Sequence, residues 1–147
     1  MVNWQKEAID DLRRYPALRQ SLDSIRARRA ALDLQAGAVR SSFRDAAPVS
    51  GGGGSGAEDK LIACIMERER LAANYKAVSK LVRQIEIALS LLGDDEQLAL
   101  ERFYIHRQER HVERLCEELG YEKSSVYELK NRALRRFTIA MYGILDL

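Results

Sequence analysis

The sequence predicts an all-α fold. Leu, Ala, Arg and Glu dominate its 147 residues, and it has one threonine and 7% aromatic residues, whereas strands favour Thr and aromatic side chains. Over long stretches, apolar residues recur three or four positions apart, which is the helical period. We expect a long antiparallel helical hairpin joined to a C-terminal domain of shorter helices. The expected parts are an N-terminal helical arm at 1–43, a glycine-rich linker at 44–57, a long helix pairing with the arm at 58–93, and the C-terminal domain at 94–147.

The N-terminal arm carries one apolar stripe at an alternating four-three spacing, which predicts an amphipathic helix. Pro16 lies inside the stripe, and an interior proline removes a backbone hydrogen bond. We therefore expect a short helix near 3–14, a break or kink, and a long helix near 17–40. The stripe consists of Trp4, Ala8, Tyr15, Leu18, Leu22, Ile25, Leu32, Ala36 and Val39, with Asp11 and Arg29 as its polar members.

Residues 44–57 interrupt the helical pattern with four consecutive glycines, 51–54. Such a run predicts a flexible connector, because glycine loses much backbone entropy when it is ordered. The Gly-Gly-Gly-Gly-Ser segment is also the usual synthetic linker, so an engineered origin is one alternative. A phosphate-binding loop is excluded, because Gly56 is followed by Ala-Glu and not by Lys-Ser or Lys-Thr.

The longest helix is expected over 58–92, with a length on the order of 50 Å. Ser55 and Glu58 form a predicted capping box at its start, and Gly93 a predicted left-handed cap at its end. One apolar stripe on so long a helix needs a partner, which is either the N-terminal arm or a second copy of the chain. The stripe consists of Leu61, Ile65, Ala72, Tyr75, Val78, Val82, Ile85, Leu89 and Leu92.

Three shorter helices are expected next: one capped by Asp94 and ending near 107, one over 112–119 and one over 124–141. Residues 112–131 fit a helix-turn-helix pattern, because a small residue lies in the middle of the first helix, a glycine in the turn, and apolar anchors three apart in the second helix. Gly120 in the turn is expected to take a left-handed backbone conformation. The alternative is a plain helical hairpin with a glycine turn. The residues that carry the pattern are Leu115, Cys116, Leu119, Gly120, Val126, Leu129, Ala133 and Phe137.

The face of the second helix opposite its apolar anchors is polar, as expected of a helix that enters the major groove. Ser124, Glu128, Asn131 and Arg135 point outward, and Asn, Arg and Glu can bond adenine, guanine and cytosine edges. The alternative is an ordinary solvated face, with a capping box from Ser125 to Glu128. The expected DNA-contacting residues, which include phosphate-binding cations and flanking groups, are Lys123, Ser124, Ser125, Tyr127, Glu128, Lys130, Asn131, Arg132, Arg135 and Arg136.

Charge is distributed unevenly over the C-terminal domain, although the whole chain has a formal net charge of only +2. Residues 94–122 hold nine acidic and four basic side chains, whereas residues 123–136 hold one acidic and five basic ones. A basic helix on an acidic support is typical of a nucleic-acid docking surface. Because one copy can neutralise few phosphates, we expect weak binding by a monomer and a homodimer as the functional unit.

Four stretches of the C-terminal part, at 98–105, 115–121, 124–127 and 132–137, resemble the fourth region of bacterial sigma factors. The whole chain resembles phage-encoded transcriptional regulators of the RinA and ArpU type. Those proteins pair an N-terminal helical hairpin with such a helix-turn-helix, and often have a Pro/Gly-rich link that ends in Asp-Lys.

In this chain Pro48, glycines 51–54 and Asp59-Lys60 occupy the place of that link, which favours a native linker. The resemblance implies a double-stranded DNA-binding activator of late phage genes, with bacterial RNA polymerase as a candidate partner. His111 and Glu122 stand where the family has better helix-capping residues. They keep open a second hypothesis, a helical adaptor in phage assembly or packaging with a degenerate helix-turn-helix.

No other chemistry is indicated by residue spacing. His106 and His111 lie five apart with no Cys-x-x-Cys nearby, so we expect no metal site, no cofactor and no enzymatic activity. The N-terminus lacks the pattern of a signal peptide, and no apolar run reaches the ~18 residues that a membrane span needs. We therefore expect a cytoplasmic protein of the bacterial host cell, with no membrane partner and with Cys64 and Cys116 reduced.

Overall fold

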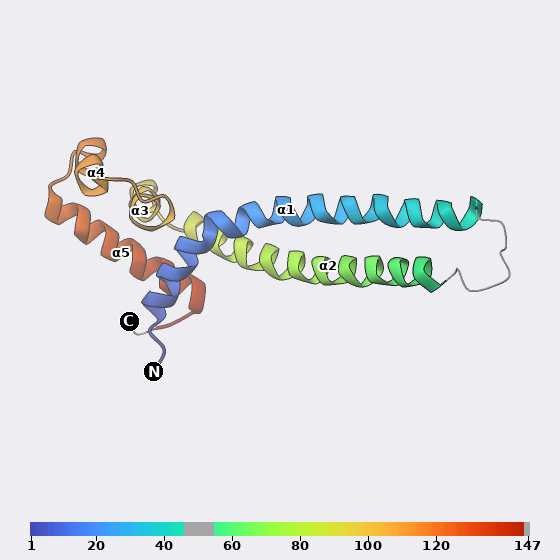
Figure 1. Ribbon diagram of the computed structural model, residues 1–147. Coiled ribbons are helices and arrows are strands. Elements are labelled where there is room, and N and C mark those ends of the chain that lie inside the picture. Colours follow the sequence, from blue (N-terminus) through green and yellow to red (C-terminus); the bar gives the residue numbers. More distant parts are fainter. Residues whose placement is uncertain (46–54, 146–147) are drawn as a thin grey trace. The chain divides into compact units, whose positions relative to one another are not determined.

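The fold is all-helical, as predicted, over the residues that the structure describes (Figure 1). The computed structural model describes residues 1–45 and 55–145, and at 43–45 and 55 the backbone alone. None of the described helices is long and apolar enough to cross a membrane. The elements in chain order are α1 (Trp4–Asp45), α2 (Ser55–Ser90), α3 (Asp94–Leu100), the π-helix η1 (Glu101–Ile105), α4 (His111–Leu119) and α5 (Lys123–Tyr142).

Of the break or kink predicted near Pro16, the break is wrong, because α1 continues through that residue as one helix. An interior proline costs a helix about 3 kcal/mol. Buried neighbours offset that cost: Ala8 and Leu12 are fully buried in the turns before Pro16, and Tyr15 packs against the same core. Leu12, which the sequence stripe had omitted, therefore belongs to the inner face of α1.

The predicted linker at 44–57 is too long at both ends, because α1 reaches Asp45 and α2 begins at Ser55. The remainder of that linker, 46–54, lies outside the described residues, as does the Ser55 side chain of the predicted capping box. The predicted left-handed cap at Gly93 is also wrong. Gly93 has φ −68° and ψ 163°, which is extended backbone, and it is the N-cap of α3 in place of Asp94.

The described chain forms two compact units, which differ from the predicted domains. Residues 1–19 and 80–147 make unit 1, and residues 20–79 make unit 2. Unit 1 thus includes both the first turns of α1 and the last turns of α2. The reason is a shared core, because α1, α2, α3 and α5 all contribute buried side chains to one cluster: Ala8, Leu12, Ile85, Ala88, Leu92, Leu100, Ala133, Leu134 and Phe137.

Unit 2 consists of the remaining parts of α1 and α2, which run antiparallel and side by side (Figure 1). Arg26 lies 5.3 Å from the Tyr75 ring, and Asp33 pairs with Arg68 at 2.7 Å, so residue numbers fall along α2 as they rise along α1. These contacts lie at the surface, where an ion pair contributes about 0–1 kcal/mol. Burial of apolar side chains, among them Ala36 on α1 and Cys64 and Leu71 on α2, contributes more to unit 2 than these surface pairs do.

The single helix predicted from 94 to about 107 is instead α3 followed by η1. The N–H of His106 donates to the carbonyl of Glu101 at 2.8 Å, the five-residue spacing of a π-helix. The wider turn places neighbouring side chains of η1 on two different cores. Phe103 belongs to a cluster under α4 and α5, whereas Ile105 packs against the shared core of unit 1.

Candidate nucleic-acid interface

The α4–α5 segment occupies the residues predicted for a helix-turn-helix. Gly120 ends α4 with φ 69° and ψ 27°, the left-handed conformation predicted for it, and its N–H donates to the carbonyl of Cys116 at 2.9 Å. Glu122 then takes an extended conformation as the N-cap of α5, and no side-chain bond caps that end. The chain therefore turns within the three residues between α4 and α5, which brings α5 against α4.

A small apolar core holds α4 and α5 together. Val112 and Leu115 of α4, Val126 of α5 and Phe103 of η1 are buried against one another. Because Val126 is in the first turns of α5, this core determines which face of the helix turns inward. The partly buried side chains around the core are Leu98, Tyr104, Cys116 and Leu119.

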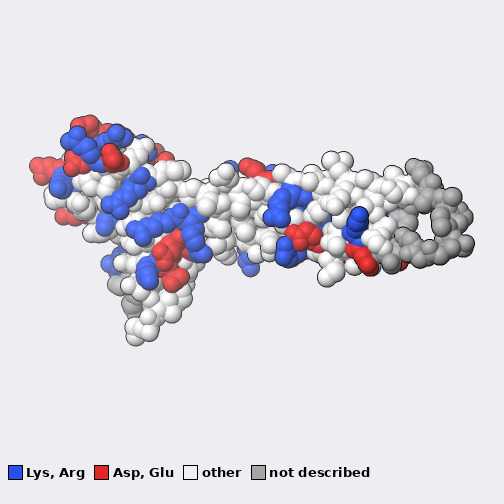
Figure 2. Space-filling view, in the orientation of Figure 1, with Lys and Arg blue, Asp and Glu red and all other residues white. Residues whose placement is uncertain are grey.

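The outward face of α5 is solvent-accessible where the sequence predicted it. Ser124, Glu128, Asn131 and Arg135 are exposed, as is Lys123 at the start of the helix. Figure 2 shows Lys and Arg side chains gathered over this part of the molecule, with acidic side chains interspersed. Ser125, by contrast, is half-buried. The alternative capping box from Ser125 to Glu128 is wrong, because α5 begins at Lys123 and Ser125 is already inside it.

Two predicted contact residues, Lys130 and Tyr127, lie against the ring of Phe103. The Lys130 ammonium lies 5.6 Å from the Phe103 ring and 5.9 Å from the Tyr127 ring. The Tyr127 and Phe103 rings meet edge to face at 5.9 Å, yet Tyr127 remains exposed. Nearby, burial raises the pKa of Tyr104 above its usual 10.0. Lys130 thus lies on the flank of α5 that turns toward η1.

Two predicted arginine contacts pair with a buried acid on α3. Arg136 forms an ion pair with Glu96 through Nη1, and its Nη2 lies 3.4 Å from the carbonyl oxygen of Leu91. Arg132 approaches Glu96 through Nε, at 3.7 Å from Oε2. Sequence reasoning missed Glu96, because an acidic residue in the first turn of a helix is expected to be solvated.

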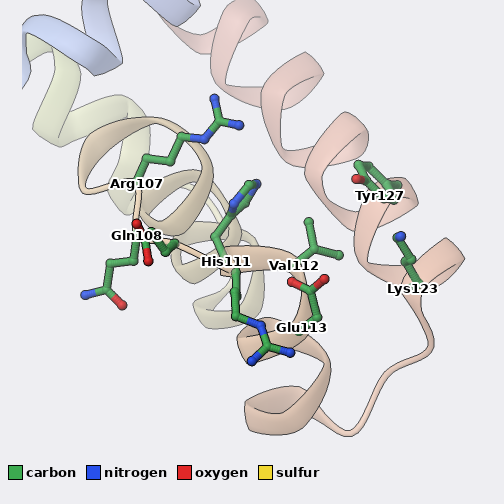
Figure 3. Close-up of a pocket in the computed structure, with 9 residues that line it drawn as sticks. Arg107, Gln108, His111, Val112, Glu113, Lys123 and Tyr127 are labelled. Atoms are coloured by element: carbon green, nitrogen blue, oxygen red, sulfur yellow. The ribbon is translucent and has the colours of Figure 1, made fainter.

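A hollow of about 590 Å³ lies beside the N-termini of α4 and α5. Figure 3 shows Lys123 and Tyr127 on α5 across the hollow from His111 and Glu113 on α4. The sequence predicted only Lys123 and Tyr127 as contacts here. No sequence signal indicated the α4 residues of the lining, and only turn composition indicated its loop residues between η1 and α4, which are Arg107, Gln108, Glu109 and Arg110.

Arg110 has φ 56° and ψ 35°, a left-handed conformation that a side chain disfavours by about 1 kcal/mol or more. It is the N-cap of α4, the position next to the one where His111 was expected to cap. The loop is further held by Arg114, whose Nη1 donates to Gln108 at 2.6 Å. The start of α4 is therefore fixed by loop geometry without a capping side chain.

The arrangement can bind a polyanion through exposed cations and can present hydrogen-bonding groups from one helix face. Within residues 1–45 and 55–145, no group of three or more His, Cys, Asp and Glu side chains is placed to hold a metal ion. A scan against protein-family models, a search of curated proteins and a search of solved structures each found no match.

Proposed function

We propose that this protein is a sequence-specific double-stranded DNA-binding transcriptional regulator that inserts α5 into the major groove. The observation that carries the proposal is the two-sidedness of α5. Val126, Leu129 and Ala133 are buried on one side, while Asn131 and Arg135 are exposed on the other. A helix fixed on a core by one face and polar on the opposite face is what direct readout of base edges requires.

The charge of α5 supports DNA binding, and its small size favours a dimer that presents two such helices. The five basic side chains of residues 123–136 give affinity for phosphates, but Arg136 is already engaged with Glu96. A single α5 therefore neutralises few phosphates, and its affinity falls steeply with salt. A homodimer that presents two α5 helices to half-sites would restore tight binding.

The resemblance to phage regulators adds a biological setting for this activity. It suggests activation of late phage genes in the bacterial cytoplasm, with RNA polymerase as a protein partner. Neither the operator nor the partner is needed to test DNA binding itself.

Selection from a pool of random duplexes, followed by electrophoretic mobility assays, tests the proposal. We expect enrichment of one sequence, and affinity for it at least ~10³-fold above that for an unrelated duplex. Equal binding to all duplexes, or none at low salt, would contradict sequence-specific regulation. The control is Arg83→Ala, which removes an exposed positive charge on α2 and leaves α5 unchanged, so it should bind the selected duplex as the parent does.

A second candidate function, a helical adaptor in phage assembly or packaging, is favoured by exposed apolar side chains of unit 2. Leu34 is 78% and Met66 65% exposed, and Ile62 lies beside Met66 on the same face of α2. Scattered apolar residues are common on protein surfaces, so this observation carries less weight than the α5 face. Absence of duplex binding, together with a stable complex with a packaging protein, would favour the adaptor.

A further inference from the structure

A buried carboxylate connects the support of α5 to its exposed cations. Glu96, on the first turn of α3, has a side chain that is only 6% exposed. Its Oε1 accepts a hydrogen bond from the N–H of Gly93 at 3.2 Å and one from Nη1 of Arg136. Its Oε2 is buried and accepts no hydrogen bond from any residue in the described part of the chain. A buried carboxylate is stable only with charged partners, and both of its arginines come from α5.

The two arginines are bound differently. Arg136 uses both terminal nitrogens inside the protein, one on Glu96 and one near the Leu91 carbonyl. Arg132 approaches Glu96 only through Nε, at 3.7 Å, which is an ion-pair distance beyond hydrogen-bonding range. Within residues 1–45 and 55–145, neither terminal nitrogen of Arg132 makes a hydrogen bond, and its side chain is 60% exposed. Arg136 therefore serves the fold, and Arg132 keeps a free guanidinium fork.

The position of Arg132 suits a backbone contact. It lies at the edge of the outward face, one turn after Glu128 and one turn before Arg136. Together with Tyr121 and Ser125 it lines a hollow of about 270 Å³ beside the turn that precedes α5. Residues that flank a groove-reading helix reach phosphates and not base edges, and the planar fork of arginine matches a phosphate in a bidentate way.

We propose that Glu96 is a positioning residue for DNA binding, which orients Arg132 through its Nε so that the two terminal nitrogens bind a backbone phosphate. This inference rests on the proposed function and adds to it a contact that carries no sequence information. Glu96, Arg132 and Arg136 together carry one net positive charge. Arg136 neutralises Glu96, so the charge of Arg132 remains available to a phosphate.

Orientation and simple charge make opposite predictions for Glu96→Gln. This substitution removes a negative charge and so raises the net charge of the protein by one, which by charge alone tightens binding to DNA. If Glu96 orients Arg132, the same substitution weakens binding, because Arg132 loses the partner that holds it. Asp94→Asn is the matched control: it changes the net charge equally on the same helix turn, at an exposed side chain that forms no ion pair with either arginine in the described part of the chain.

The experiment is a double-mutant cycle, read by fluorescence anisotropy with a labelled duplex of mixed sequence at several salt concentrations. We expect Arg132→Gln to weaken binding roughly tenfold, and to lower the slope of log affinity against log salt by about 0.9. Glu96→Gln is expected to weaken binding several-fold in the parent and to have no such effect in the Arg132→Gln background. Arg135→Gln, which removes an exposed charge that does not touch Glu96, should combine additively with Glu96→Gln.

A second measurement is independent of DNA. The Arg132 Nε–H signal in a proton–nitrogen NMR spectrum, assigned by its loss in Arg132→Gln, should shift in Glu96→Gln and stay in place in Asp94→Asn. Thermal unfolding by circular dichroism shows that each variant is folded at the assay temperature.

Two failures are distinguishable. If the wild-type protein binds the duplex but Glu96→Gln tightens binding as Asp94→Asn does, or weakens it equally with and without Arg132, the positioning role is overturned and the DNA-binding function stands. If the wild-type protein binds no duplex at low salt, the proposed function fails and this inference fails with it.

Discussion

The hydroxyl of Tyr142, in the last turn of α5, donates a hydrogen bond to Oδ2 of Asp11, which is buried in α1. The two residues are 131 positions apart, and the Trp4 ring packs 5.0 Å from the Tyr142 ring beside them. The end of the candidate recognition helix is thereby fastened to the start of the chain within unit 1. A helix that reads a groove must be held rigidly, and this contact holds the end opposite the α4 turn.

Tyr142→Phe should therefore destabilise unit 1. The substitution keeps the ring and its packing on Trp4, but leaves the buried Asp11 carboxylate without one of its donors. We expect a loss of about 1–3 kcal/mol in the free energy of unfolding, measured by urea denaturation. Arg14 also pairs with Asp11 and limits the loss. Unchanged stability would mean that this hydrogen bond contributes nothing in solution.

The same contact predicts how stability depends on pH. Burial, and then the bond to Asp11, raise the pKa of Tyr142 above its usual 10.0, so the neutral phenol is favoured in the folded state. Its contribution is complete below pH 10 and is lost as the pH rises through the higher folded-state pKa. Wild-type protein should lose stability above pH 10 more steeply than Tyr142→Phe. Parallel profiles would contradict the assignment; Tyr15 and Tyr104, whose pKa values are also raised, remain in both proteins.

Gly120→Val should weaken folding and DNA binding together. Among the described residues, no heavy atom that a new β-carbon could contact lies within 4 Å of it, so the penalty comes from the left-handed backbone, about 1–2 kcal/mol. Gly120→Asn is the matched variant, because asparagine tolerates this conformation, and it should retain most of the stability. Melting temperatures from circular dichroism test both. A valine variant as stable as the parent would show that the left-handed turn is not required.

Asn131→Ala and Arg135→Ala test the outward face of α5. If either side chain reads a base edge, its loss should cost about 1–3 kcal/mol of affinity for the selected duplex, with a much smaller loss on an unrelated one. Both side chains are exposed, so folding should not change. Unchanged affinity in both variants, with folding verified by circular dichroism, would rule out this docking of α5.

A homodimer is the expected functional unit. Sedimentation equilibrium at micromolar concentration should give about twice the chain mass of 16.7 kDa. Ile62→Glu combined with Met66→Glu places charges on an exposed apolar face of unit 2, and should shift the equilibrium toward monomer if that face is the interface. A mass near 16.7 kDa over the whole range, with full DNA affinity, would contradict the dimer.

Helical periodicity predicted the buried face of α1 better than the buried face of α2. The stripe of α1 lies on its buried or half-buried face from Ala8 to Val39, apart from the omitted Leu12. On α2 the predicted stripe was one residue off in two turns, since Cys64 and Leu71 are buried where Ile65 and Ala72 had been chosen. Over a helix this long, choices at neighbouring positions are nearly equivalent in sequence, and only the packed partner distinguishes them.

The sequence by itself determined the all-α class, the left-handed turn at Gly120 and the polar outer face of α5, because these depend on local backbone preference and on the 3.6-residue period. The continuity of α1 through Pro16, the π-turn at Glu101–Ile105 and the pairing of Glu96 with two arginines were decided by the tertiary structure. Each depends on energy from residues distant in sequence, namely burial that outweighs a lost backbone bond, or a charge that is stable only when its partners arrive. A local sequence pattern does not identify the distant residues that supply this energy.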